Sequence, residues 1–176
     1  MAPTAALGTP NLQGIAPCQP AAPLTIEETE GPYFKAGSPE RTSLIEPGVS
    51  GTKLVISGQV FFPDCTPVAN ARLEFWQADA QGQYDNGGNK LRGHQQTDAQ
   101  GRYQVTTIVP GLYPGRTRHI HVKVQAPSGP VLTTQLFFPG EPQNATDGTY
   151  NATLLLPIHV AADGSQSAAF NFVARG

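Results

Sequence analysis

Short runs of alternating apolar and polar residues, separated by turn residues, are the main pattern along this chain. The clearest runs are six to ten residues long and rich in Val, Ile, Tyr, Phe and Thr. Such runs predict β-strands that bury one face and expose the other. We expect seven of these strands, at residues 53–62, 71–77, 102–109, 119–124, 131–138, 152–158 and 168–173.

Turn signals such as Pro110-Gly111 separate the runs, and no segment of convincing length has a helical period. Seven short strands at this spacing predict an all-β protein with an antiparallel β-sandwich. We expect residues 1–23 to form an extended N-terminal arm and residues 24–176 to form the sandwich domain. The polar segment at 78–90 is long for a hairpin loop, and long loops in compact domains are commonly functional.

Composition supports this fold class and removes several functional classes. The 176 residues include 19 Gly and 17 Pro, which disfavour helices, and only 11 Lys and Arg with 13 Asp and Glu. The net charge of −2 comes with no basic or acidic block, so neither a nucleic acid nor a membrane surface is expected as a partner. No apolar run is long enough to span a bilayer, and the first residues do not resemble a signal peptide.

The two cysteines, Cys18 and Cys65, allow two interpretations. They are either unrelated thiols or one disulfide that ties the arm to the sandwich. A disulfide would indicate an oxidising compartment and would stabilise the fold by roughly 3–4 kcal/mol. Neither cysteine lies in a CxxC motif, so we do not expect a cysteine-based metal or redox site.

The sequence His119-Ile120-His121 is the first candidate for chemistry. Residues i and i+2 of a strand point to the same face, so the two imidazoles could bind one metal ion. A pair of exposed strand histidines, or a copper or zinc site with another third ligand, would carry the same pattern. Arg116 and Arg118 lie just upstream, and two arginines beside two histidines suggest an anionic ligand.

The stretch 110–124, PGLYPGRTRHIHVKV, resembles the intradiol ring-cleavage dioxygenases, the family of protocatechuate and catechol dioxygenases. The resemblance covers about residues 24–142. It includes further segments at 30–34 (EGPYF), 75–84 (FWQADAQGQY), 91–98 (LRGHQQTD) and 134–138 (TQLFF).

The resemblance implies one non-haem Fe(III) ion, held by Tyr84, Tyr113, His119 and His121. A hard ferric ion favours anionic oxygen and imidazole ligands over thiolate. A phenol titrates near pKa ~10 in water, but a coordinated cation can remove its proton at neutral pH. The donor types therefore agree with the metal that the family uses.

The family also implies roles and a reaction. Tyr113 would be a labile ligand and a base, Arg116 would stabilise negative charge on the bound ring, and Gln135 would face the same pocket. O2 would cleave a catechol between its two hydroxyl-bearing carbons to give a cis,cis-muconate-type diacid. We expect a monomer or small homo-oligomer that acts on small molecules. The segment that borders the substrate would contain Gly31, Pro32 and Tyr33.

Two departures from the family suggest an open pocket. Gly115 stands where protocatechuate-type enzymes carry a bulky residue, and the connection from Tyr113 to His119 is brief. The chain resembles the small secreted members of the family, so we expect an extracellular enzyme that acts on catechols such as lignin fragments. The alternative is that residues 54–107 resemble a transthyretin-like or carboxypeptidase-regulatory β-sandwich, a binding module without catalysis.

Overall fold

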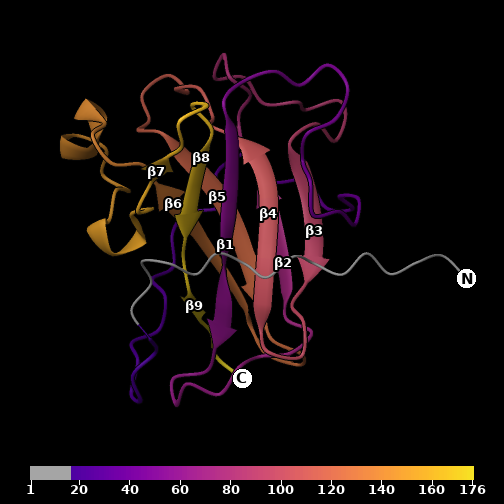
Figure 1. Ribbon diagram of the computed structural model, residues 1–176, viewed down its shortest axis with the longest axis vertical. Helices are drawn as coiled ribbons and strands as arrows, with labels where there is room; N and C mark the ends of the chain where they lie inside the picture. The colour runs from indigo at the N-terminus through magenta and orange to yellow at the C-terminus, as the bar shows by residue number, and fades with distance from the viewer. Residues whose placement is uncertain (1–16) are drawn as a thin grey trace, which may run out of the picture.

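Two β-sheets pack face to face in this computed structural model, which describes residues 17–176 (Figure 1). The first 16 residues of the expected arm lie outside the described range. One sheet has the order β4-β1-β8-β7, with β9 also paired to β1, and the other has the order β3-β2-β5-β6. The first sheet consists of β1 (Lys53–Phe61), β4 (Arg102–Ile108), β7 (His159–Val160), β8 (Gln166–Ala169) and β9 (Phe172–Val173). The second consists of β2 (Arg72–Trp76), β3 (Arg92–Gln96), β5 (His119–Gln125) and β6 (Val131–Phe137).

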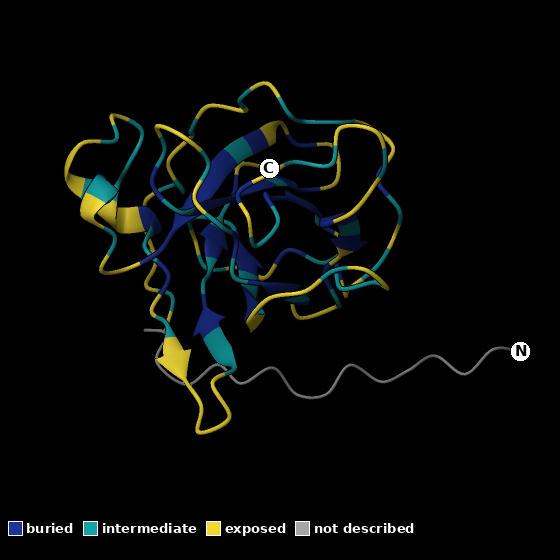
Figure 2. Cartoon of the chain, turned by 90° about the horizontal axis from the view of Figure 1, so that it is seen from above, coloured by how far each residue is buried: buried dark blue, intermediate teal, exposed yellow. Residues whose placement is uncertain are grey.

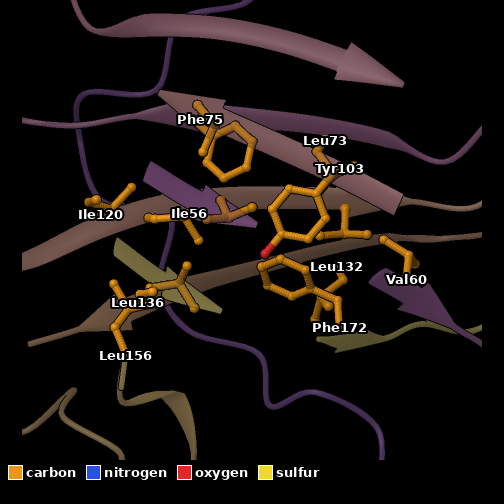
Figure 3. Packing of buried hydrophobic residues seen from close by; sticks show 14 of the residues in the cluster. Ile56, Val60, Leu73, Phe75, Tyr103, Ile120, Leu132, Leu136, Leu156 and Phe172 are labelled. Carbon is orange, nitrogen blue, oxygen red and sulfur yellow. The ribbon is translucent and has the colours of Figure 1, made fainter. Parts of the chain in front are cut away.

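The core lies between the two sheets and is lined by the apolar faces of their strands. Figure 3 shows Tyr103 and Phe172 of the first sheet facing Phe75 and Leu132 of the second. The Tyr103 hydroxyl donates a hydrogen bond to the Phe170 carbonyl oxygen at 2.8 Å, so its one polar atom is satisfied inside the core. Most buried residues lie in the strands and most exposed residues in the loops, but the short strand β7 is exposed (Figure 2).

The outer face of the second sheet is covered as well. In β5, Ile120, Val122 and Val124 belong to the core, so His119, His121 and Lys123 point to the opposite face. The chain at 24–34 runs along β6 and covers that face. The Glu28 amide donates to the Thr133 carbonyl oxygen at 2.9 Å. This segment shields the outward side chains of β5 from water. Without it, they would lie on a solvent-exposed sheet face.

Several strand predictions need correction. The strand expected at 152–158 is wrong, because Ala152–Leu154 is a 3₁₀ turn (η2). The Asn151 side chain accepts the backbone N–H of Thr153 at 3.0 Å and so begins a turn. The strand expected at 168–173 is broken between β8 and β9. There the Asn171 side chain accepts a hydrogen bond from the backbone N–H of Gln59 at 2.9 Å. Both pieces pair with β1 in parallel, so the sandwich is not purely antiparallel.

The remaining helical structure among residues 17–176 is one more 3₁₀ turn, η1 (Pro142–Ala145). No helix in this part of the chain is long and apolar enough to cross a membrane. Cys18 and Cys65 form a disulfide, with their Cα atoms 5.7 Å apart. The bond ties the end of the expected arm to the turn after β1.

Candidate metal centre

The two histidines of β5 present their imidazoles side by side on the outer face of the sheet. His119 is 5% exposed and His121 is 3% exposed, and their Nε2 atoms are 3.1 Å apart. The Nδ1 atom of His119 lies 2.6 Å from the Thr117 carbonyl oxygen. Because a carbonyl oxygen only accepts, Nδ1 carries the proton and Nε2 keeps a free lone pair.

The phenol oxygen of Tyr84 completes a triangle with the two imidazoles. It lies 3.3 Å from Nε2 of His119 and 3.1 Å from Nε2 of His121. The Nδ1 atom of His121 is buried and has no hydrogen-bond partner among residues 17–176. Three lone-pair donors that converge in this way suit a cation, and imidazole with phenol oxygen suits a ferric ion. In the same part of the chain, His, Cys, Asp and Glu side chains form no group of three that could hold a metal.

Tyr113 lies next to this triangle, with its ring centroid 5.8 Å from that of Tyr84, but its hydroxyl bonds to Tyr33. The Tyr113 and Tyr33 hydroxyl oxygens are 2.7 Å apart, a hydrogen bond in which either can donate. The Tyr33 ring stacks on the Tyr84 ring, with centroids 4.6 Å apart, and meets the Tyr113 ring edge-on at 5.5 Å. The structure therefore brings three of the four expected ligands together and pairs the fourth with Tyr33.

Two glycines allow the loops that carry Tyr84 and Tyr113 to pack against each other. Gly82 has a φ of +82°, and a Cβ there would lie 2.2 Å from the Leu112 carbonyl oxygen. A Cβ at Gly111 would lie 2.4 Å from the Gly82 nitrogen, so neither position has space for a side chain. The Gly111 amide also donates to the Asp79 carbonyl oxygen at 2.7 Å. Gly82 and Gly111 thus allow close contacts between the two loops, and these contacts orient the two tyrosines.

The strand register places Trp76 and Gln135 on either side of His121. Trp76 of β2 and Gln135 of β6 are both direct partners of His121 across the sheet. The Trp76 and His121 rings are stacked, with centroids 4.8 Å apart and planes 7° apart. Trp76 is therefore a wall of the site and holds the plane of the His121 ring.

Arg116 reaches the site from the loop before β5 and is held by several groups. Its Nη2 donates to Oε1 of Gln135 at 2.7 Å, and its Nε donates to Oδ2 of Asp147 at 2.8 Å. Gln135 is fully buried, and its Nε2 donates to the Thr29 carbonyl oxygen at 2.8 Å. Gln135 thus joins Arg116 to the covering segment.

The three residues expected to border the substrate lie in that covering segment. A Cβ at Gly31 would stand 3.5 Å from Cε1 of His121, which brings the backbone close to the site. Pro32 is exposed, and Tyr33 is the residue of the three that contacts the other tyrosines.

Arg92 and Asp147 are site residues that the sequence did not single out. Arg92 is 2% exposed; its Nη1 donates to the Tyr33 carbonyl oxygen at 2.6 Å and its Nε to the Asp85 carbonyl oxygen at 3.1 Å. It therefore joins the segment that carries Tyr33 to the loop that carries Tyr84. The paired arginines before His119 suggested an anionic ligand, whereas in the structure Arg116 pairs with Asp147 and Arg118 with Glu141.

Burial keeps the donor groups in their neutral forms. It raises the pKa of Tyr84 well above its usual value, an effect that the charges of Arg116 and Arg92 partly oppose. Burial likewise lowers the pKa of His119 to about 4 and that of His121 well below its usual range. A cation that binds here would meet neutral imidazoles and would displace the Tyr84 proton.

We expect acid to destabilise the metal-free protein through His119. Its pKa is about 4 when folded and about 6.5 when unfolded, so between pH 7 and pH 5 the unfolded chain takes up a proton that the folded chain does not. The free energy of unfolding should therefore fall by about 2 kcal/mol over this interval from His119 alone. Urea unfolding at the two pH values measures the loss, and a His119→Gln variant should show a smaller one. An equal loss in that variant would contradict the assignment.

Comparisons with known proteins agree with these features. The profile of a family described as Dioxygenase matches residues 29–176. The chain is 36% identical over 121 residues to the protocatechuate 3,4-dioxygenase beta chain of Burkholderia cepacia, covering 58% of this chain and 52% of that protein. It is 33% identical over 158 residues to hydroxyquinol 1,2-dioxygenase of Rhodococcus opacus, covering 76% and 53%. The chain thus spans about half the length of these curated relatives.

A solved structure matches over nearly its whole length. It is the dioxygenase domain of a dioxygenase and carbohydrate-binding protein fusion from the cellulolytic bacterium Streptomyces sp. SirexAA-E. The two chains are 52% identical, with a TM-score of 0.83, and the match covers 86% of this chain and 97% of the other. The 3-chlorocatechol 1,2-dioxygenase of Rhodococcus opacus 1CP is 27% identical with a TM-score of 0.77, covering 85% and 71%.

Proposed function

Because the chain belongs to the intradiol ring-cleavage dioxygenase family, we propose that it cleaves catechol-type rings with O2 and one non-haem Fe(III) ion. The products would be cis,cis-muconate-type diacids. One observation carries the proposal. The Tyr84 oxygen and the Nε2 atoms of His119 and His121 converge within 3.3 Å of one another.

These three side chains would hold the iron, and Tyr113 would be the fourth protein ligand. When bound, ferric iron withdraws electron density from a chelated catechol and so makes the ring reactive towards O2. Phenolate and imidazole donors suit this role because they neutralise part of the ferric charge.

Tyr113 would move a proton during substrate binding. Its phenolate would accept a proton from a catechol hydroxyl, and the neutral hydroxyl would then need a hydrogen-bond partner. The Tyr33 hydroxyl, 2.7 Å from the Tyr113 oxygen, is such a partner. Tyr33 would therefore hold Tyr113 aside while the substrate occupies the site.

Arg116 would stabilise negative charge on the bound ring. Its Nε and Nη2 groups are engaged by Asp147, Gln135 and Thr149, whereas Nη1 makes no hydrogen bond within residues 17–176. A preorganised donor of this kind stabilises charge as it develops in the transition state. Gln135 would act by keeping the guanidinium in place.

A binding module without catalysis, the alternative function, finds no support here. Such a module does not need a buried triangle of two imidazoles and a phenol oxygen. The match to the dioxygenase family also extends over 29–176, well beyond the 54–107 segment that suggested the alternative.

We also propose that the enzyme is extracellular and accepts several catechols. The Cys18–Cys65 disulfide supports an oxidising compartment, and the related fusion protein comes from a cellulolytic bacterium. A Cβ at Gly115 would meet nothing within 4 Å, which supports an open entrance. We expect action on small molecules by a monomer or small homo-oligomer, without a nucleic-acid or membrane partner.

The proposal can be tested by loading the purified protein with Fe(III). Tyrosinate bound to Fe(III) should give a red-brown visible band that shifts when catechol is added without O2. Admitting O2 should then yield the diacid from catechol, 4-methylcatechol and hydroxyquinol, and Zn(II)-loaded protein is the control. A colourless protein with full iron content, or a spectrum that catechol leaves unchanged, would rule out the dioxygenase. Activity on protocatechuate alone would rule out the open entrance.

A further inference from the structure

A row of polar side chains on the 3₁₀ segment around η1 lies against the tripeptide that precedes the histidines. Asn144 lies in η1, Glu141 lies directly before η1, and Asp147 lies two residues after its end. The three side chains meet the tripeptide in reverse order. Their partners are Arg118, Thr117 and Arg116, respectively.

Asp147 makes the largest number of these contacts. Its Oδ2 accepts from Nε of Arg116 and from the Thr117 amide, both at 2.8 Å. Its Oδ1 accepts from the Thr149 amide at 2.9 Å and from the Thr149 hydroxyl at 2.7 Å. The Asp147 side chain is only 3% exposed. Four donors therefore converge on one buried carboxylate, which leaves the group a single orientation.

The contacts of Asp147 lead to the site by two routes. The first runs through the guanidinium of Arg116, whose Nη2 donates to both Gln135 and Thr149. The second runs through the backbone of one residue, because the Thr117 N–H donates to Asp147 while the Thr117 carbonyl oxygen accepts from Nδ1 of His119. A shift of Asp147 would move a charged group and a ligand imidazole together.

We propose that Asp147 is a positioning residue that fixes Arg116 and orients His119 through the backbone of Thr117. The expected effect on turnover rests on the proposed function, whereas the effect on the two side chains does not. Glu141 contacts a different arginine. It pairs with Arg118, which also donates to the Pro110 carbonyl oxygen, so it acts on the loop that carries Tyr113.

Asp147→Asn tests the proposal with little change of shape. Asn offers one acceptor oxygen to four donors and turns an N–H toward two of them, so Arg116 or the backbone of Thr117 must move. In the iron-loaded enzyme, kcat should fall by about 10- to 100-fold with a smaller change in KM.

Asp98→Asn is the matched control. Asp98 also accepts from an arginine Nε, that of Arg102 at 2.8 Å, and from the Gln100 and Arg102 amides. It lies in the turn before β4, at the other end of that strand from the Tyr113 loop. This variant should keep the wild-type kcat.

Hydrogen exchange of side-chain N–H groups in the metal-free protein tests the role of Asp147 independently of the dioxygenase reaction. In protein labelled with ¹⁵N-arginine and ¹⁵N-histidine, the Arg116 Nε–H and His119 Nδ1–H signals should be protected from exchange with solvent. Both should lose protection in Asp147→Asn and keep it in Asp98→Asn. Unchanged protection in Asp147→Asn would overturn the proposal, whether or not the wild type cleaves catechol.

A double-mutant cycle distinguishes positioning from a general loss of stability. In an Arg116→Leu background, Asp147→Asn should lower kcat far less than it does in the wild type, because its main target is gone. Equal losses in the two backgrounds would contradict the proposal. If Asp147→Asn does not fold, Thr149→Val removes one hydroxyl contact to Asp147 and another to Arg116. It should reduce Arg116 protection and kcat in the same direction, and no change would overturn the proposal.

Discussion

Tyr84→Phe should lower both the affinity for Fe(III) and kcat by more than about 100-fold, a larger loss than changes outside the ligand set cause. The variant removes one of three donor atoms that lie within 3.3 Å of one another. Of the remaining proposed ligands, the two imidazoles are neutral, so Tyr113 alone would offset the ferric charge. The phenyl ring can still stack on Tyr33, so the loop should keep its place. Iron retained after dialysis against citrate, together with the visible spectrum and kcat, measures the effect.

Tyr103→Phe is a suitable control for this variant. It deletes another buried tyrosine hydroxyl, which donates to the Phe170 carbonyl oxygen in the core between the sheets. This change should cost about 1 kcal/mol of stability and leave iron affinity and kcat as they are. If Tyr84→Phe kept iron as tightly as Tyr103→Phe does, Tyr84 would not be a ligand.

Removal of the disulfide is the second large expected effect, and it acts on stability. Cys18 and Cys65 are 47 residues apart, and in the chain-entropy model a crosslink of this span stabilises by about 4 kcal/mol. The Cys18→Ala/Cys65→Ala variant should therefore unfold at a lower urea concentration and at a temperature about 8–16 °C lower. Urea and thermal unfolding of the oxidised wild type and the variant measure the difference.

The two single cysteine variants provide the control. Each breaks the same bond, so each should lose nearly as much stability as the double variant. Activity at low temperature should survive in all three. The segment at 24–34 keeps contacts of its own to the sandwich, such as the bond from the Thr25 amide to the Val173 carbonyl oxygen at 3.0 Å. A loss below about 1 kcal/mol in the double variant would show that the disulfide contributes little.

Local pattern predicted the long strands well and the short ones poorly. The expected strands at 53–62, 102–109 and 131–138 end within one residue of the observed ones. Along these strands alternate side chains face the opposite sheet, which favours an apolar residue at every second position. The failures at 152–158 and 168–173 each involve an asparagine side chain that bonds to backbone, Asn151 or Asn171. Nothing in the alternation of apolar residues reports such bonds.

In the candidate site, too, contacts between residues close in sequence were predicted, whereas contacts between residues far apart in sequence were not. His119 and His121 share a face because they lie two apart in a strand, and this followed from the sequence. The cover over that face did not follow, since the outer side of a sheet can equally face solvent. The pairing of Tyr113 with Tyr33 joins residues 80 positions apart and was equally beyond local pattern.

The sequence by itself determined the β class, the long strands, the paired imidazoles and, through its motifs, the family and its candidate ligands. These properties depend on backbone preferences and on residues a few positions apart, so neighbours in the chain carry the information. Only the tertiary structure decided that Tyr84 meets both histidines, that Tyr113 bonds Tyr33, and that Asp147 is the acid that holds Arg116. Each of these contacts joins separate loops and strands. Their meeting depends on how the sheets pack and on where each buried charge finds a partner, which no local pattern encodes.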